Sequence, residues 1–417
     1  MSEILDYKLH HDLRRYIMRL NPDEQHQLRN IRLCGQRING NYSSVYLVAS
    51  DKGNAKFVGQ THCRNPFCCP ICSAKVMEQY RSKIATAIEI LHNEYFGFMV
   101  SFSMPHVSFM GCREVLDIIC DAWQYFRRKN YKKPSGHAFH DFNQVVPVCH
   151  HVKVCEQTHG KHGWHHHFHM IWWVKRGDER HLLEWESKLS EFWHKVCRMK
   201  TLKYWQKHSL HQNILEIDKT FDKVLDRMYA PSEAHQGIVF SKDEHGNVRE
   251  VESAEYIAGW GADRELTGNY RKVASHEGHM TPYQILEAAQ HDPKMRDLYL
   301  EFCLAMTQKP VHHRVDFSQT GLCKMIEAYR KEHGSESVIA QKKKLDGETQ
   351  KFRIVTYFSK EQWFELLHLN NYSPVLSNIL FLAAKYVHLL GDYLSSLGIE
   401  IGSIPRDYDM VEEMLSA

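Results

Sequence analysis

The chain has 417 residues, of which 43% are hydrophobic, so it can bury a sizeable core and has room for two or three domains. Its formal net charge of +3 permits nucleic-acid binding without requiring it. Residues 1–20 lack the apolar segment of a signal peptide, and no stretch approaches ~18 uninterrupted apolar residues. We therefore expect a cytoplasmic globular protein with no membrane partner.

The pattern of the N-terminal residues predicts a cysteine-rich module. Residues 1–30 have a polar helical pattern, and two apolar segments, 44–48 and 56–59, flank the turn residues 51–54 and predict a hairpin. The hairpin would return the chain toward Cys34 just where a cluster of further cysteines begins. Twelve cysteines in a cytosolic chain favour thiols and metal ligands over disulfides.

Four of these cysteines have the spacing of a tetrahedral zinc site. Cys69 and Cys72 form a Cys-x-x-Cys knuckle that contains a proline, and Cys34 and Cys63 supply two further thiolates. Such a closed four-sulfur site leaves no open coordination position, so we predict a structural Zn²⁺ rather than a catalytic one. Cys68 is the spare thiol, and ordinary packing or redox use of the cluster are the alternatives.

From Ser73 onward the pattern predicts helices alternating with strands. A helix is expected from Ser73, a buried strand over 98–104, a helix over 113–127, and strands over 145–156 and 164–174. Because the connector between the last two strands is short, we expect them to pair antiparallel.

The second of these strands carries histidines at every second position. Residues i and i+2 of a strand point to one side, so His165, His167 and His169 share a face while His166 and Phe168 take the other. Imidazoles at this spacing can chelate a divalent ion. A fortuitous cluster among 30 histidines and a solvated loop are the competing interpretations.

Glu156 ends the strand that should pair with the histidine strand, so its carboxylate can reach an ion held by His167 and His169. Two imidazoles and one carboxylate leave coordination positions open, which suits Mg²⁺ or Mn²⁺ acting as a Lewis acid on a phosphoryl oxygen. A solvated strand-end carboxylate is the alternative for Glu156.

The remainder predicts more strands and helices. An amphipathic helix over 182–199 precedes a strand at 214–217, a second hairpin at 237–248 and a helix over 253–260. Beyond residue 290 the pattern is mainly helical, with a Lys-rich linker or exposed loop over 331–350. We expect an α+β fold with a central antiparallel sheet flanked by helices, divided into an N-terminal zinc-binding module and helix (1–92), a domain that carries the sheet (93–290) and a mainly helical C-terminal region (291–417).

Tyr256 lies in the helix expected over 253–260, and Glu252 immediately precedes that helix. Because the two residues are four positions apart, a helical conformation would place them on one face. A tyrosine can attack a phosphodiester, and a neighbouring carboxylate could orient or deprotonate the water that later hydrolyses the link. Most of the 20 tyrosines will be structural, so spacing alone carries little weight here.

Taken in order, these motifs resemble the rolling-circle replication initiator (Rep) proteins of small bacterial plasmids, members of the HUH endonuclease superfamily. The resemblance covers roughly residues 30–325 and implies that residues 93–290 form a nicking endonuclease domain. It is carried by Cys69–Lys75, Met99–His106, Glu156–Gly160, Gly163–His169, Glu252–Trp260, Gly261–Gly268, Thr281–Leu286 and Asp297–Met306.

The resemblance implies a five-stranded antiparallel sheet that carries a divalent ion on Glu156, His167 and His169, with Tyr256 as the nucleophile. The tyrosine would nick one strand of origin DNA, keep the 5′-phosphate and free a 3′-hydroxyl primer, and Glu252 matches a glutamate used for terminating hydrolysis. Many members have Lys where this chain has Gly259, which leaves Lys242 or Lys272 as candidates for activating the phenol. Many also have Pro in place of His166, which keeps His165 as an alternative ligand.

The partners that follow from the resemblance are single-stranded or hairpin origin DNA, duplex DNA, a host helicase and a DNA polymerase, with homodimerisation left open. A basic track with stacking side chains should hold the strand. Its candidates, which are equally consistent with solvated surface runs, are Arg127, Arg128, Lys132, Lys133, Tyr204, Trp205, Arg271 and Lys272.

Three other functions remain as alternatives. A transposase or relaxase would use the same chemistry, although the transposases that resemble Rep proteins often display a tyrosine pair. A zinc-stabilised DNA-binding regulator would use the histidines only structurally. A zinc hydrolase is the weakest of the three, because the chain has no His-Glu-x-x-His pattern.

Overall fold

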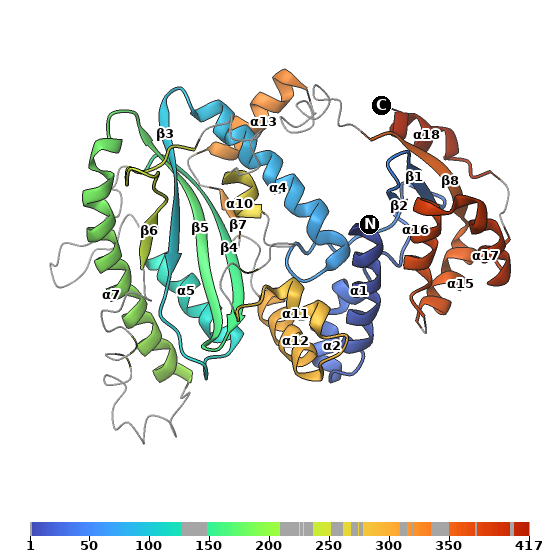
Figure 1. Ribbon diagram of the computed structural model, residues 1–417, viewed down its shortest axis with the longest axis horizontal. Helices are drawn as coiled ribbons and strands as arrows, with labels where there is room; N and C mark the ends of the chain where they lie inside the picture. The colour runs from blue at the N-terminus through green and yellow to red at the C-terminus, as the bar shows by residue number, and fades with distance from the viewer. Residues whose placement is uncertain are drawn as a thin grey trace. The chain divides into compact units, whose positions relative to one another are not determined.

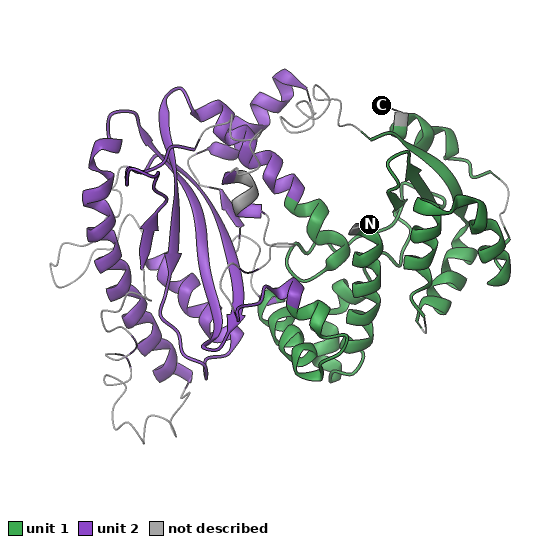
Figure 2. Ribbon diagram, in the orientation of Figure 1, with its two compact units in different colours: residues 1–77, 285–307, 340–417 green, residues 78–284, 308–339 purple. Residues whose placement is uncertain are grey.

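The structure is a computed structural model. It describes residues 2–126, 148–208, 225, 228, 237–251, 262–267, 274, 278–308, 315–317, 321–334, 350–371, 373–400 and 404–416. The chain forms two compact units (Figure 2), of which unit 1 comprises Met1–Met77, Ile285–Thr307 and Ala340–Ala417, and unit 2 comprises Glu78–Gln284 and Gln308–Ile339.

Unit 1 contains a three-stranded antiparallel sheet in the order β2-β1-β8. The hairpin of β1 (Val45–Ser50) and β2 (Ala55–Val58) matches the one expected from the sequence. The third strand, β8 (Phe352–Phe358), pairs with the other edge of β1 from about 300 residues further along the chain. Apolar side chains of this sheet, such as Phe57 at 5.2 Å between ring centroids from Trp363, form its core with the helices around them.

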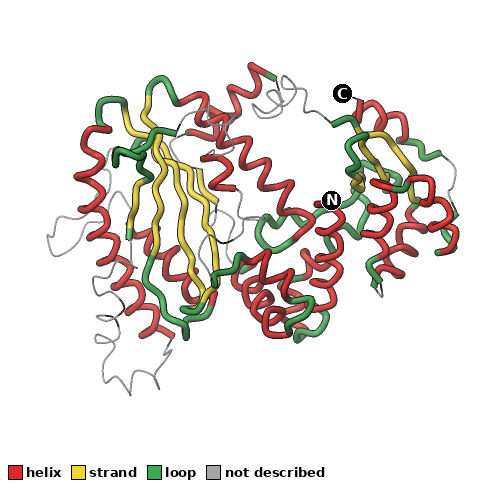
Figure 3. The backbone as a smooth tube through the Cα atoms, viewed as in Figure 1, coloured by secondary structure: helices red, strands yellow, loops and turns green. Residues whose placement is uncertain are grey.

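Helices joined by loops make up the rest of the described part of unit 1 (Figures 2 and 3), and local signals set the ends of two of them. Asn21 caps one helix by accepting a hydrogen bond from the Glu24 amide, with Pro22 as its first residue. Ser359 and Gln362 form a capping box at another. The helices are α1 (Ser2–Ile17), α2 (Pro22–Gln27), α3 (Arg29–Arg32), α12 (Pro293–Thr307), α15 (Lys360–Asn370), α16 (Val375–Lys385), α17 (Leu390–Ser396) and α18 (Tyr408–Ser416).

Unit 2 is built on a five-stranded antiparallel sheet in the order β6-β3-β5-β4-β7 (Figure 1). The two longest strands, β4 and β5, form a hairpin, as the short connector predicted. The strands are β3 (Tyr95–Ser103), β4 (His150–Gly160), β5 (Gly163–Lys175), β6 (Ile238–Phe240) and β7 (Val315–Phe317). The α+β fold with a central five-stranded antiparallel sheet is therefore confirmed.

The two faces of this sheet differ. One is packed with aromatic rings and covered by α5 (Cys112–Phe126) and α7 (Leu182–His208): the Phe102 ring lies 5.5 Å from Trp123 and 5.1 Å from Trp193. On the other side lies α10 (Ala262–Thr267), which contacts β4 and β5 (Figure 1). The remaining helices are α4 (Pro70–Leu91) and α11 (Pro282–Ala288), which both cross the boundary between the units, and α13 (Leu322–His333).

Several sequence-based expectations are modified. The units are not consecutive segments 1–92, 93–290 and 291–417, because β8 returns to pair with β1 and residues 285–307 join unit 1. The C-terminal region carries β7 and β8 as well as helices. The start of the stretch 331–350 belongs to α13, and the strand expected at 214–217 and the helix at 253–260 lie outside the described residues. Among the helices that the structure describes, none combines the length and apolar character needed to cross a membrane.

Candidate metal centres

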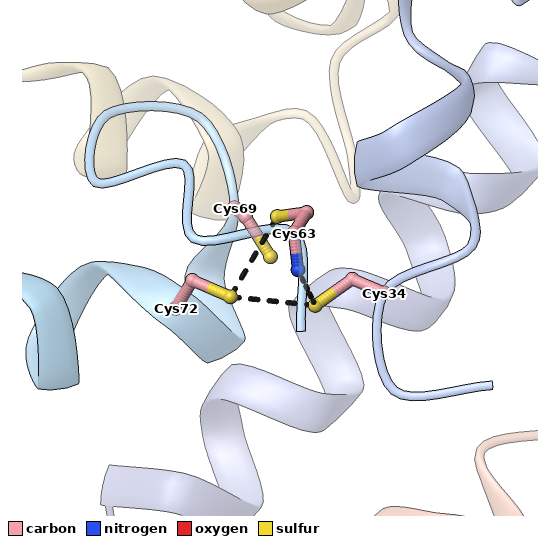
Figure 4. Close-up of side chains that lie close together, drawn as sticks. All are labelled: Cys34, Cys63, Cys69 and Cys72. Carbon is pink, nitrogen blue, oxygen red and sulfur yellow. Dashed lines mark hydrogen bonds between the residues drawn. The ribbon is translucent and has the colours of Figure 1, made fainter. Parts of the chain in front are cut away.

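The four cysteines expected to bind zinc converge in unit 1 (Figure 4). Cys34 follows α3, Cys63 follows β2, and Cys69 and Cys72 lie at the start of α4. The sulfur of Cys72 is 3.4 Å from that of Cys34 and 3.6 Å from that of Cys63, and all four sulfurs lie within 4.8 Å of one another.

These distances fit a tetrahedral ion and exclude disulfide bonds. A zinc ion with Zn–S bonds of ~2.3 Å holds its sulfurs ~3.8 Å apart, whereas bonded sulfurs lie only ~2 Å apart. Cys34, Cys69 and Cys72 are buried, and all four thiols are free. Hydrogen bonds from Cys34, Cys63 and Cys69 lower the pKa of the Cys72 thiol, which favours a thiolate in the cluster. The cluster could therefore hold zinc.

The second group of ligand-type side chains lies in unit 2 and comes from the β4–β5 hairpin. Glu156 pairs directly with His167, and Val154 pairs with His169. Because cross-strand partners project to the same face, this register sets the carboxylate beside both imidazoles. The three side chains offer ligand atoms within 4.8 Å of one another, on the face opposite the aromatic rings.

The donor atoms of this Glu-His-His group are closely spaced. Glu156 Oε2 lies 2.6 Å from His169 Nε2 and 3.1 Å from His167 Nε2, and the two Nε2 atoms are 3.0 Å apart. Neighbouring ligands of an octahedral ion with bonds of ~2.1 Å lie ~3.0 Å apart, so these atoms fit one triangular face of such an ion. Two facing Nε2 atoms cannot both donate a proton to each other, whereas both can donate a lone pair to one cation.

A serine on the adjacent strand orients one of the imidazoles. Ser101 of β3 pairs with His169, and its Oγ lies 2.9 Å from His169 Nδ1. If Nδ1 carries the proton and donates to this hydroxyl, Nε2 is left with its lone pair directed at Glu156 and His167. The sequence-based reasoning missed Ser101, although its alternation within the strand expected over 98–104 was a usable signal.

Burial and charge act in opposite directions on the carboxylate. Glu156 is only 5% exposed, which raises its pKa, but hydrogen bonds and the charges of His167 and His169 outweigh this and hold the pKa well below its usual range. The site therefore keeps an anionic carboxylate beside two nitrogen ligands.

His165 shares the face of His167 and His169 but not their group of donor atoms. Its Nδ1 lies 3.4 Å from Nδ1 of His106, a residue that the sequence did not single out. Burial and the neighbouring histidines lower the pKa of His165 to about 2. His166 projects to the opposite side, where its ring is fully buried and its Nε2 lies 3.5 Å from the Cys112 sulfur.

Glu252, Tyr256 and six of the basic candidates lie outside the described residues: Arg127, Arg128, Lys132, Lys133, Arg271 and Lys272. The two flanks of the tyrosine segment are described. Val251 donates its amide hydrogen to Gly97 of β3, and α10 contacts β4 and β5.

Two aromatic candidates for DNA stacking are described, and they differ. Trp205 is fully buried, and its indole nitrogen donates a hydrogen bond to Glu114, so it has no ring face to offer a base and belongs to the core. The preceding residue, Tyr204, is partly exposed and its ring lies 4.4 Å from that of His208. Lys242, a candidate for activating the phenol, forms an ion pair of 2.8 Å with Glu186.

No family model matches the chain, and comparisons with curated proteins and with solved structures likewise found no match.

Proposed function

We propose that the chain is a metal-dependent nicking enzyme of the HUH type that initiates rolling-circle replication of a plasmid. The observation that supports this most is the convergence of Glu156, His167 and His169 on one face of a five-stranded antiparallel sheet. The spacing of their donor atoms suits a six-coordinate ion that keeps positions open for substrate oxygens.

In this proposal the three side chains hold Mg²⁺ or Mn²⁺, which would supply Lewis-acid polarisation of a scissile phosphate. Glu156 contributes negative charge, and Ser101 keeps the His169 ring oriented. The cysteine cluster, which belongs to the other unit, would hold a structural Zn²⁺.

Tyr256 would be the nucleophile. Its oxygen forms a bond to phosphorus as the bond from phosphorus to the 3′-oxygen breaks, and the phenol proton is transferred to solvent or to the departing oxygen. The products are a 5′-phosphotyrosine and a 3′-hydroxyl primer, and Glu252 would later direct a water at the covalent link. The described flanks of this segment, Val251 and α10, both contact the sheet that carries the Glu-His-His group, which supports the assignment.

The test is to incubate the protein with Mn²⁺ and single-stranded DNA from its own replicon, and to look for a covalent adduct on a denaturing gel. We expect the adduct to disappear in Tyr256→Phe and to persist in Tyr270→Phe. The reverse result would move the nucleophile to Tyr270.

The metal assignment needs separate variants. A His167→Ala, His169→Ala double variant should abolish cleavage, while His162→Ala, which changes an exposed histidine in the turn of the same hairpin, should not. Cleavage that survives the double variant would contradict the metal site. Duplex or single-stranded DNA binding without any cleavage in the unaltered protein would favour a non-catalytic DNA-binding regulator.

A further inference from the structure

Unit 1 contains a hollow of about 450 Å³ whose lining carries an unusual concentration of positive charge. It lies among α1, α3 and the end of α15. Four arginines line it together with amide, histidine and apolar side chains: Arg14, Arg15, Arg19, Arg32, His11, Gln36, Asn370, Asn371, Met18 and Leu33. No Asp or Glu is among these lining residues, although the chain as a whole is nearly neutral at +3.

Two of the lining arginines, Arg14 and Arg32, carry buried nitrogen atoms that lack partners within the described part of the chain. The Nε atoms of Arg14 and Arg32 are buried and form no hydrogen bond among the residues that the structure describes. Among the described residues their terminal nitrogens contact neutral groups: Arg14 Nη2 donates to Asn371 Oδ1 at 2.7 Å, and Arg32 Nη1 lies 2.8 Å from the Met18 sulfur, a weak acceptor.

The like charges in the hollow also repel each other. Burial and the charge of Arg32 lower the pKa of Arg14 to about 10, a large departure for a guanidinium. Within the described part of the chain, none of the four guanidinium groups forms an ion pair with a carboxylate. A partly buried cation without a counter-charge, such as Arg14 or Arg32, is costly, and a bound anion would lower that cost.

The number and type of groups indicate which anion. Guanidinium groups present planar forks of donors that match the oxygens of phosphate, and several of them together suit more than one negative charge. Of the lining arginines, Arg15 and Arg19 are exposed and Arg14 is partly buried, so the hollow offers charge at more than one level of burial. A volume of this size accommodates a diphosphate or a nucleotide unit of a strand.

We propose that this arginine-lined hollow is a phosphate-binding site, which takes either the phosphodiester groups of a nucleic-acid strand or a free polyphosphate. The site does not depend on the proposed nicking reaction and lies in the unit that carries the cysteine cluster.

Two probes distinguish the sources of phosphate: inorganic pyrophosphate, followed by calorimetry, and a fluorescent oligothymidylate, followed by anisotropy, both with the full-length chain and without added divalent metal. We expect at least one probe to bind, and Arg14→Gln or Arg32→Gln to weaken it about tenfold or more, since each removes charge-assisted hydrogen bonds. Binding of the oligonucleotide alone assigns the site to a strand, and binding of pyrophosphate alone assigns it to a free polyphosphate.

The matched control is Arg29→Gln, which removes one charge from an exposed position of the same helix as Arg32, outside the hollow. It should leave the affinity within about twofold of the unaltered protein. Because Arg14 is partly buried, an Arg15→Gln, Arg19→Gln variant at the exposed lining positions repeats the test without risk to folding, with melting temperatures recorded for each. Absence of binding by both probes, or equal weakening by Arg29→Gln and the lining variants, overturns the proposal.

Discussion

The two candidate metal centres gather their ligands in opposite ways. The four cysteines come from three separated stretches of unit 1 and form a closed, largely buried set of sulfurs. The Glu-His-His group of unit 2 comes from two neighbouring strands, has three donors and leaves its histidines partly exposed. A closed set of four ligands crosslinks chain segments, so the cysteine cluster should govern stability. A set of three ligands on a rigid sheet leaves coordination positions open for a substrate, so the Glu-His-His group should govern chemistry.

The largest effect should come from breaking the cysteine cluster. Cys69→Ser removes one of four thiolates, so we expect the zinc content to fall from near one per chain to near zero and unit 1 to lose several kcal/mol of stability, since structural zinc contributes roughly 10 kcal/mol of binding energy to folding. Elemental analysis and thermal unfolding measure both. Cys68→Ala, at the adjacent thiol outside the cluster, should keep the zinc; equal metal loss in both variants would refute the assignment.

Removing a ligand of the second centre should affect metal binding and leave the fold intact. His169→Ala should weaken Mn²⁺ binding by more than ~100-fold, because even loss of an outer hydrogen-bond partner costs ~10–100-fold. Its melting temperature without metal should change little, since the His169 side chain is partly exposed. Titration followed by electron paramagnetic resonance of free Mn²⁺ gives the affinity, with His162→Ala as control. If the variant unfolds, the Glu-His-His group has a structural role like the one that we assign to the cysteine cluster.

A smaller effect is expected at the hydroxyl that orients His169. Ser101→Ala should reduce Mn²⁺ affinity about 10-fold, because the imidazole loses the partner of Nδ1 but keeps its place in the register. Ser101→Thr, which retains a hydroxyl, should recover most of that affinity in the same titration. Unchanged affinity in Ser101→Ala would mean that packing alone orients the ring.

The smallest effect concerns acid sensitivity in unit 1. His10 is buried, its Nε2–H donates to the Ile31 carbonyl at 2.8 Å, and burial lowers its pKa from 6.5 to about 4. Its neutral form is favoured by folding, so its contribution is present above pH 6.5 and is lost as the pH falls toward 4. At pH 5.5 the loss relative to pH 7.5 should be about 1 kcal/mol, at ~1.4 kcal/mol per pH unit.

His10→Gln should remove this part of the pH dependence, measured as the difference in unfolding free energy between the two pH values. His26→Gln, at an exposed position of α2, should retain it. Since both variants keep the cysteines, acid release of zinc cancels in the comparison. An unchanged pH dependence in His10→Gln would show that other groups of unit 1, such as His11 or the cysteine cluster, make it acid-sensitive.

Local patterns predicted the elements around both centres well. The alternation of His165, His167 and His169 was enough to place them on one face, because a strand repeats every two residues. The turn residues 51–54 were enough to predict the β1–β2 hairpin, which closes over a few residues. Both depend on neighbours in the sequence.

Features that join distant segments were not predictable in the same way. Nothing near β8 indicates that it will pair with β1, and nothing in the pattern of Trp205 distinguishes a stacking side chain from a core one. The arginine-lined hollow combines Arg14 and Arg32 with Asn371 from about 340 residues further on. The spacing of residues within one segment does not indicate which distant segment it will contact.

The amino-acid sequence alone determined the ligand types of the two centres, the shared face of the histidines and the α+β class, because these follow from side-chain chemistry and from the periods of helix and strand. Only the tertiary structure decided that Glu156 faces His167, that Ser101 orients His169, and that four arginines share one hollow. Those relations depend on strand register and on packing between remote segments, which are set by the burial of the whole core.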